Sequence, residues 1–233
     1  MAYTTIKKPS DYFNTKLYTG DGANYPSTQS ITGVGFQPDL IWLKSRNNAY
    51  PHFLYDAVRT NRYAIFTNDT QAENSGTVNQ MTSFDSDGFK VANDGAGVAT
   101  NGSGSTMTSW NWLASNTTAS NTDGTISSTV SANTTSGFSI VSYTGTGSDA
   151  TVGHGLGSTP KMIIFKRIDS ATNWSVQSTI WGDQKELNLN TTGALSLTDS
   201  RLSIQSTWTN TLFNVKTYGD QNASGGTFIA YCF

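Results

Sequence analysis

The chain has 233 residues with a formal net charge of −2, and only 13% of its residues are charged. That fraction is about half of the ~25% usual for globular domains, and the abundance of Gly, Ser, Thr and Asn is typical of a β-rich protein with many turns. The balance of 14 Lys and Arg against 16 Asp and Glu excludes the basic surface that a nucleic-acid partner requires. No signal-like segment follows Met1 and no apolar run approaches ~18 residues, so we expect synthesis in the cytoplasm and no membrane span.

An internal repeat organises the sequence, with Pro38 and Pro160 lying 122 residues apart at equivalent places. Three blocks of the first half recur in the second: YTGDG (18–22) as YTGTG (143–147), GVGFQP (33–38) as GLGSTP (155–160), and LIWLK (40–44) as MIIFK (162–166). The offset persists downstream, from Asn68 to Asn190 and from Thr106 to Thr227. The sequence therefore predicts two copies of one module.

The repeat divides the chain into four parts. Residues 1–15 have no counterpart in the second copy and predict an extended N-terminal docking arm, in which Lys7-Lys8-Pro9-Ser10 reaches a partner. Module one spans residues 16–114. Residues 115–136 are polar and poor in apolar anchors, which predicts a linker with one short strand at 126–130, and module two spans residues 137–233.

Short runs rich in apolar and aromatic residues predict strands, while helical periodicity is nearly absent. The expected strands are 13–19, 39–44, 52–58, 63–67, 88–92 and 106–113 in the first module, and 137–144, 161–167, 173–178, 186–190, 202–205, 212–217 and 226–233 in the second. Helical turns are plausible only at 50–58 and 180–187. About seven short strands in about 100 residues predict an all-β fold, a β-sandwich of jelly-roll or lectin-like type in each module.

The last strand of each module carries large side chains at alternating positions, which lie on one face of a strand. They are Thr108, Trp110 and Trp112 in the first copy, and Ile229, Tyr231 and Phe233 in the second. Because both copies keep an aromatic pair there, we predict a packed core and not a platform for stacking sugars. Residues 40–43 and 162–165 are apolar on both faces, which predicts central strands covered by the neighbouring module, another subunit or a long loop.

The Gly-x-Gly pairs precede strands and not helices, so they do not form a phosphate-binding loop. We interpret them as tight turns and bulges in which glycine adopts a positive φ. His154 stands where the first copy has Thr32, and we interpret it as a turn residue and not as a catalytic group.

Few residues suggest catalysis. Asp85 and Asp87 in SFDSDGF, with Asp56 in LYDAVR, are the candidates for a carboxylate pair, but FDSDGF is typical of a turn between two strands. Whether Asp85 and Asp87 hold a calcium ion stays open at this point. His52 has no nucleophile in a triad-like motif, and no Gly-x-Ser-x-Gly sequence occurs. We therefore expect no enzyme, no cofactor and no catalytic or metal-binding residue.

Two further features have structural interpretations. The single cysteine, Cys232, excludes an intrachain disulfide and a cysteine-based zinc site, and we expect a small core residue. The loop SRNNAYP (45–51) combines an aromatic ring, a guanidinium and amides, which suits a solvated hairpin and also hydrogen bonding to a glycan. We assign no ligand-binding residue.

The sequence resembles a family of β-sandwich repeat proteins encoded among the structural genes of marine tailed bacteriophages. The resemblance covers nearly the whole chain and lies in these blocks: AYTTIKKPSDYFNTKLYTGDG, SITGVGFQPDLIWLKSR, LYDAVR, SFDSDGF, the WNW strand end, SANTTSGFSIVSYTGTGSDATVGHGLGSTPKMIIFKR and the final FIAYCF. Members are commonly described as tail-fibre or virion structural proteins. Similar chains often continue into a further repeat after YCF, whereas this sequence stops there.

The resemblance implies a virion component, assembled in the host cytoplasm and located on the virion exterior. We expect a tail fibre or another surface appendage that takes part in host attachment, with other virion proteins as partners of the arm. A capsid decoration or head-fibre protein and a glycan-binding module are the alternatives, and sandwiches serve all three roles. Because fibres are symmetric oligomers, we expect a homo-oligomer, with a trimer favoured, and a host cell-surface glycan as a further partner.

Overall fold

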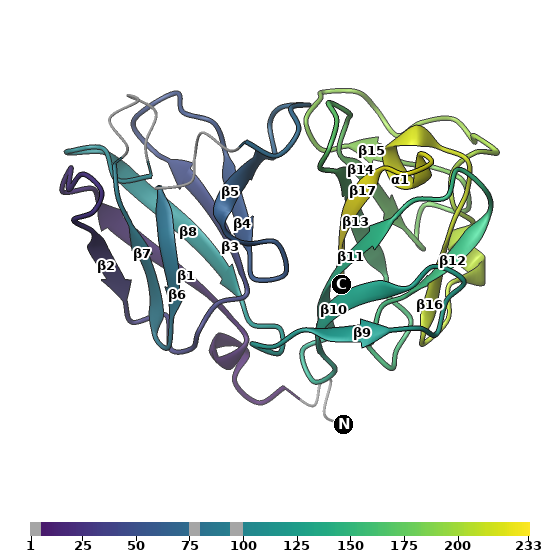
Figure 1. The fold of residues 1–233 in the computed structure, drawn as a ribbon, viewed down its shortest axis with the longest axis horizontal. Helices are drawn as coiled ribbons and strands as arrows, with labels where there is room; N and C mark the ends of the chain where they lie inside the picture. Colours follow the sequence, from purple (N-terminus) through teal and green to yellow (C-terminus); the bar gives the residue numbers. More distant parts are fainter. Residues whose placement is uncertain (1–5, 75–79, 94–99) are drawn as a thin grey trace. The chain divides into compact units, whose positions relative to one another are not determined.

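The computed structural model describes residues 6–74, 80–93 and 100–233, and their regular secondary structure is almost entirely antiparallel strand (Figure 1). They form two compact units. The first contains the chain up to Thr67 and then Glu73–Asn116, and the second contains Asn68–Ala72 and Thr117–Phe233. The predicted all-β sandwich fold is confirmed.

The first unit consists of a five-stranded and a three-stranded sheet, which Figure 1 shows as two layers. The five-stranded sheet has the order β1 (Phe13–Thr19), β8 (Thr106–Trp112), β3 (Leu40–Ser45), β4 (Phe53–Asp56) and β5 (Thr60–Phe66). The smaller sheet has the order β2 (Gln29–Thr32), β7 (Gly88–Val91) and β6 (Met81–Asp85). Both sheets contribute buried side chains to one core, including Ile41, Phe53, Met107, Phe89 and Val91.

The second unit consists of a seven-stranded and a two-stranded sheet. The larger sheet has the order β15 (Leu187–Asn188), β14 (Ser175–Ser178), β13 (Met162–Arg167), β17 (Thr227–Cys232), β11 (Phe138–Thr144), β10 (Ser128–Asn133) and β9 (Ala119–Asn121). The smaller sheet pairs β12 (Ala150–Gly153) with β16 (Leu212–Val215). Its core includes Val141, Ile163, Phe165, Phe213 and Phe228.

The two units share a strand order. Strands β1-β8-β3-β4-β5 correspond to β11-β17-β13-β14-β15. The pairing register agrees as well, because Leu40 opposes Asp56 in one unit and Met162 opposes Ser178 in the other. Individual hydrogen bonds also recur. The Tyr18 hydroxyl donates to the Thr100 carbonyl at 2.7 Å, and the hydroxyl of the equivalent Tyr143 donates to the Gln221 carbonyl at 2.7 Å.

The structure corrects the boundaries that we expected at the start and between the modules. Residues 1–5 lie outside the described part of the chain. Residues 9–11 form a short 3-10 helix, η1 (Pro9–Asp11), and residues 13–15 belong to β1, so the arm's described part is mostly folded. The expected linker 115–136 contains two strands, β9 and β10, which extend the seven-stranded sheet beside β11, and the short strand expected at 126–130 overlaps β10. Polar composition was misleading there, because Ser128 and Ser131 of β10 are buried although they are polar.

Several strand expectations also need correction. Residues 202–205 do not form a strand; the 3-10 helix η3 (Gln205–Thr207) begins at the last of them. The helical turn expected within 50–58 is wrong, because that range contains β4, and 180–187 contains no helix. Strands β2, β6 and β12 were not expected. The only α-helix of the described residues, α1 (Gly219–Asn222), was not expected either and is a single turn.

The aromatic residues of β8 do not belong to the core between the sheets, contrary to our prediction. Met107 points into that core, so Trp110 and Trp112 lie on the opposite face by alternation. Both are half-buried there. Trp110 contacts Trp42 of β3 with ring centroids 6.1 Å apart, and Trp112 contacts Phe13 of β1 at 4.8 Å. The pairing register places these rings side by side.

Candidate docking site

A lysine on the outer face of the second unit holds the segment Asn68–Ala72. Ile163 and Phe165 of β13 point into the core, so Lys166 lies on the opposite face of that strand. Its side chain is nevertheless fully buried. A buried ammonium requires hydrogen-bond acceptors, because desolvation of an unpaired charge is costly. The acceptors come from the segment and from a loop of the same sheet.

Three hydrogen bonds attach the segment to the rest of the second unit, and a fourth orients the lysine. The Lys166 Nζ donates to the carbonyl of Thr70 at 3.0 Å and to that of Thr172 at 2.9 Å. The backbone N–H of Thr172 donates to the same Thr70 carbonyl at 2.9 Å. The indole Nε1 of Trp174 donates to the carbonyl of Asp69 at 3.2 Å. Two consecutive carbonyls are therefore recognised through the backbone and not through side-chain identity.

A local turn gives the segment its shape. Asp69 Oδ1 accepts hydrogen bonds from the backbone N–H groups of Thr70 at 2.6 Å and Gln71 at 3.3 Å. This is an Asx turn, which Asp forms readily. The hydrogen bonds, first of all the one from the Gln71 side chain, lower the pKa of Asp69. The turn leaves the carbonyls of residues 69 and 70 available to Lys166 and Trp174.

The electrostatics of the site are those of a structural contact. Burial lowers the pKa of Lys166 to about 8, and the opposite charges of Asp220 and Asp69 act against that shift. Its Nζ lies 6.0 Å from the centroid of the Trp174 ring, within the range of a cation–π contact. Carbonyl dipoles and the indole face thus replace water around the charge. The site is therefore suited to holding a peptide turn.

A second cluster of polar side chains lies on the inner face of the seven-stranded sheet. Ser175 donates to Glu186 through a short hydrogen bond, and Tyr218 donates to the same carboxylate at 3.0 Å. Gln221 donates to Ser175 at 3.1 Å, and Gln205 donates to Gln177 at 2.6 Å. Burial raises the pKa of Glu186. The two hydroxyls and the amides thus satisfy the buried carboxylate and one another by hydrogen bonds.

The structure supports the interpretation of His154 as a turn residue. Its ring is buried, Nδ1 accepts from the backbone N–H of Leu156 at 3.2 Å, and Nε2 lies 3.2 Å from the carbonyl of Thr209. The ring is therefore neutral with its proton on Nε2. Burial lowers its pKa, which keeps it neutral.

The Asp85 and Asp87 carboxylates serve the turn that we predicted. Asp87 accepts from the backbone N–H groups of Gly33 at 2.9 Å and Gly35 at 2.7 Å, so it fastens the first Gly-x-Gly turn. Asp85 accepts from Ser83 at 2.8 Å and lies 3.6 Å from Lys90. Among the described residues no group of three or more His, Cys, Asp or Glu could hold a metal ion.

The remaining candidates also have structural partners. Asp56 is buried and forms an ion pair with Arg59 at 2.7 Å, which in turn reaches Glu73 at 2.6 Å. His52 is half-buried, and burial lowers its pKa. Cys232 is a buried core residue, as predicted, and burial raises its pKa to about 12.

Hydrogen bonds attach the loop 45–51 to the rest of the first unit. Asn47 Oδ1 accepts from the backbone N–H of Thr106 at 2.9 Å, and the Asn48 side chain donates to Ser105 at 3.0 Å. Lys44, the repeat equivalent of Lys166, donates to the carbonyls of Ser45 at 2.8 Å and Asn48 at 3.3 Å. The side-chain amides of Asn47 and Asn48 are therefore used in structural hydrogen bonds.

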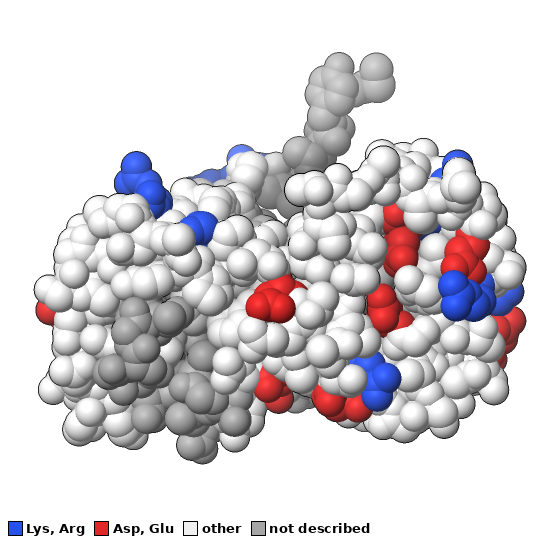
Figure 2. Space-filling view, turned by 90° about the horizontal axis from the view of Figure 1, so that it is seen from above, with Lys and Arg blue, Asp and Glu red and all other residues white. Residues whose placement is uncertain are grey.

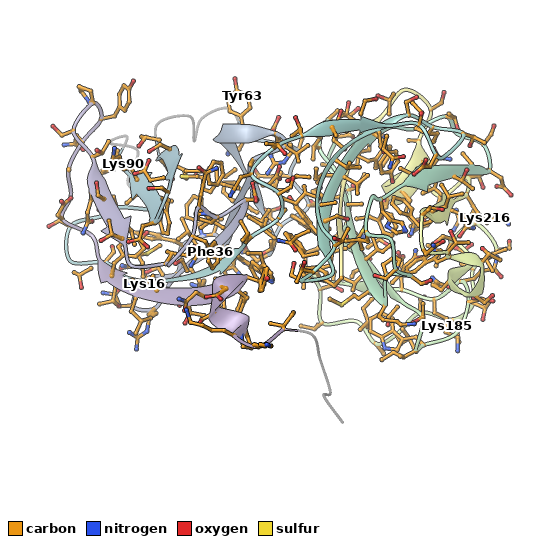
Figure 3. The ribbon with its side chains drawn as sticks, turned by 90° about the horizontal axis from the view of Figure 1, so that it is seen from below. Lys16, Phe36, Tyr63, Lys90, Lys185 and Lys216 are labelled. Carbon is orange, nitrogen blue, oxygen red and sulfur yellow. The ribbon has the colours of Figure 1, made fainter. Side chains whose placement is uncertain are left out.

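Charge is not concentrated on the face that Figure 2 shows. The Lys, Arg, Asp and Glu side chains of the described residues are scattered there among uncharged ones, with no continuous patch of one sign. A hollow of about 290 Å³ in the second unit is lined by residues that include Asp149 and Lys216, whose charged atoms lie 3.6 Å apart; Lys216 is labelled in Figure 3. No helix of the described residues is long and apolar enough to cross a membrane.

Comparison with known protein families gives a match over most of the chain. The family model described as a domain of unknown function, DUF7483, matches residues 8–233. The chain belongs to this family. No curated protein and no solved structure matches it.

Sequence reasoning missed the docking site. Lys44 and Lys166 were recognised as repeat equivalents, and so were Asn68 and Asn190, but a lysine ending an apolar strand gives no sign of its acceptors. The available signal was that Lys166 follows the two-sided apolar run 162–165, which required a cover.

Proposed function

We propose that the chain is a virion structural protein of a tailed bacteriophage, most specifically part of a tail fibre or another surface appendage that takes part in host attachment. The observation that carries the proposal is the repeated β-sandwich unit, in which one repeat's turn segment is part of the next repeat's unit. Repeats that follow one another along one chain suit elongated assemblies. The resemblance of the sequence blocks to marine phage structural proteins supports the same proposal.

The chemistry of the described residues is compatible with this role. The carboxylates and histidines that we considered hold turns and ion pairs, and the low-charge surface of Ser, Thr and Asn suits an exposed structural module. The N-terminal residues before η1 are the proposed attachment point for other virion proteins. Because β1 begins at Phe13, the docking arm is confined to residues 1–8.

Labelling on intact particles tests the proposal. An antibody against the chain should mark the tail or a surface appendage, whereas marking of the head lattice would instead assign a capsid decoration or head-fibre role. Deleting residues 1–7 should leave both units folded, as judged by circular dichroism, and abolish incorporation into particles. Incorporation of the deletion variant at the wild-type level would contradict the assignment of the arm.

The aromatic face of the first unit favours glycan binding as a second candidate function. Trp42 and Trp110 lie on it, and β1 adds Phe13 and the largely exposed Leu17. Aromatic rings on an open sheet stack against sugars. Titrating host surface polysaccharide should quench tryptophan fluorescence in the wild type and not in Trp110→Ala. An unchanged signal in the wild type would remove this candidate.

A further inference from the structure

The second repeat contains a copy of the docked segment. Residues 68–72 read NDTQA, and the equivalent residues 190–194 read NTTGA. Both segments follow the same element of the sheet. The backbone N–H of Thr67 donates to the carbonyl of His52 at 3.0 Å, and that of Leu189 donates to the carbonyl of Trp174 at 3.1 Å.

The two segments also share a turn. In the first, Asp69 Oδ1 accepts from the N–H of Gln71 two positions later. In the second, Thr191 Oγ1 accepts from the N–H of Gly193, again two positions later, at 3.3 Å. Asp and Thr form such side-chain turns by the same geometry. The local shape that presents the carbonyls of residues 69 and 70 is therefore available to Thr191 and Thr192.

The two segments differ in what they contact. The carbonyl of Thr70 accepts two hydrogen bonds within the second unit. Within the described part of the chain, no donor lies against the carbonyls of Thr191 or Thr192, and residues 191–194 are all exposed. The nearby Leu197 is 90% exposed. The second repeat thus presents an unused copy of a segment whose counterpart is docked.

The first unit contains the equivalent of the site that receives the segment. Lys44, Tyr50 and His52 stand in the places of Lys166, Thr172 and Trp174, and the intervening loops have the same length. Lys44 uses two of its three N–H donors. No acceptor among the described residues lies against the backbone N–H of Tyr50, the donor that corresponds to Thr172. Lys44 and the Tyr50 N–H are therefore the donors that a docked turn would use.

We propose that the turn at residues 190–194 docks on the Lys44, Tyr50 and His52 site of a second copy of this chain, which would join copies head to tail. In this contact the carbonyl of Thr192 accepts from the Lys44 ammonium and the Tyr50 N–H, as Thr70 does from Lys166 and Thr172. Such a heterologous contact produces rings or filaments.

The contact between copies is weaker than its counterpart within the chain. The segment 68–72 is tethered to the chain that carries its site, which raises its effective concentration to the millimolar range. Five residues also cover far less than the ~1,000 Å² of a stable interface. Association is therefore concentration-dependent and strongest where copies are already arrayed.

Disulfide trapping between separate chains tests the proposal. Thr192→Cys in one tagged chain and Tyr50→Cys in a second, differently tagged chain should form a mixed disulfide on oxidation at high protein concentration. Thr198→Cys, an exposed position in the same loop, is the matched control for Thr192→Cys and should form at least fivefold less. The pair Thr70→Cys and Thr172→Cys within one chain is the positive control.

Each outcome decides the matter. Preferential linking of residue 192 to residue 50 supports the proposal, while linking no greater than that of the residue 198 control overturns it. Failure of the 70–172 pair to link would remove the contact on which the comparison rests and would overturn it too. The measurement uses purified protein, so its failure would leave the proposed virion location untouched.

Sedimentation velocity gives an independent measurement. The weight-average sedimentation coefficient of the wild type should rise with concentration, and Lys44→Ala should abolish that rise. Lys90→Ala is the matched control, since Lys90 pairs only loosely with Asp85 in the three-stranded sheet. Equal behaviour of the two variants would contradict the assigned role of Lys44.

Discussion

Strands β4 and β14 occupy the same position in their sheets but carry opposite chemistry. On the inner face, β4 has Phe53 and Tyr55, two fully buried rings that stack with an interplanar angle of 2°. The equivalent residues of β14 are Ser175 and Gln177, which are also fully buried. The same sandwich thus forms around an aromatic cluster in one unit and a hydrogen-bonded network in the other. Register, turns and the tyrosine hydroxyl bond are common to both, so they determine the fold more than these core residues do.

Replacing an aromatic core residue of the first unit by its polar equivalent from the second should have the largest effect on stability. Phe53→Ser gives the first unit the residue of the second, and we expect a loss of about 3–5 kcal/mol, as for other deletions of a buried aromatic ring. The new hydroxyl meets no Glu186 equivalent to accept its proton. Hydrogen exchange of the first unit's amides measures the loss. A change below about 1 kcal/mol would mean that the aromatic cluster is dispensable.

Breaking the polar network should cost less. Glu186→Ala leaves the hydroxyls of Ser175 and Tyr218 without their acceptor, and we expect a loss of about 1–3 kcal/mol in the second unit. Glu186→Gln keeps an acceptor and should recover part of it. Because the folded pKa of Glu186 is raised, the folded state binds its proton more readily, so stability rises as pH falls through that pKa toward 4.5. Urea denaturation at pH 7 and pH 5 should show this gain in wild type and not in Glu186→Gln.

A close backbone approach in the first unit's smaller sheet allows a sharper comparison. Gly88 of β7 opposes Thr32 of β2 there, whereas in the second unit's smaller sheet the glycine is Gly153 of β12, which opposes Leu212. A Cβ on Gly88 would lie 1.9 Å from the carbonyl oxygen of Ile31, and its φ is +150°. We expect Gly88→Ala to destabilise the first unit by about 1–3 kcal/mol, as measured by thermal unfolding. Thr217→Ala, at an exposed loop position of the second unit, is the control and should change little.

The smallest expected effect is a pH dependence confined to the second unit. The folded pKa of His154 is lowered, so the unfolded state binds its proton more readily and stability falls as pH drops below 6.5 toward the folded value. Thr32 stands in its place in the first unit and does not titrate. His154→Asn should flatten the dependence between pH 7 and pH 5.5, after the opposite contribution of Glu186 is removed by Glu186→Gln in both proteins. An unchanged slope would contradict this.

The sequence alone predicted which strands are central in the two sheets. It did not predict which face of β8 is buried or which segment docks on the second unit. The offset of 122 residues predicted equivalent strands, and 40–44 and 162–166 are indeed central in their sheets. The faces of β8 were assigned wrongly, because ring size suggested the core while the small residues Ser109 and Asn111 turned out to be buried. Most of the range that holds the edge strand β9 and its neighbour β10 was expected to be linker, since both strands are polar and lack an apolar pattern. The docked segment 68–72 could not be predicted from the sequence, because it is bound through backbone carbonyls, which every residue has.

The position of each unit's last strand has a consequence for synthesis. Strand β8 lies between β1 and β3, and β17 lies between β11 and β13, so the final strand completes the middle of its sheet. A nascent chain therefore holds β1 and β3 apart until residues 106–112 leave the ribosome, and the second sheet waits for residues 227–232. Such late closure over long sequence separations slows folding and leaves strand edges open to chaperones in the meantime.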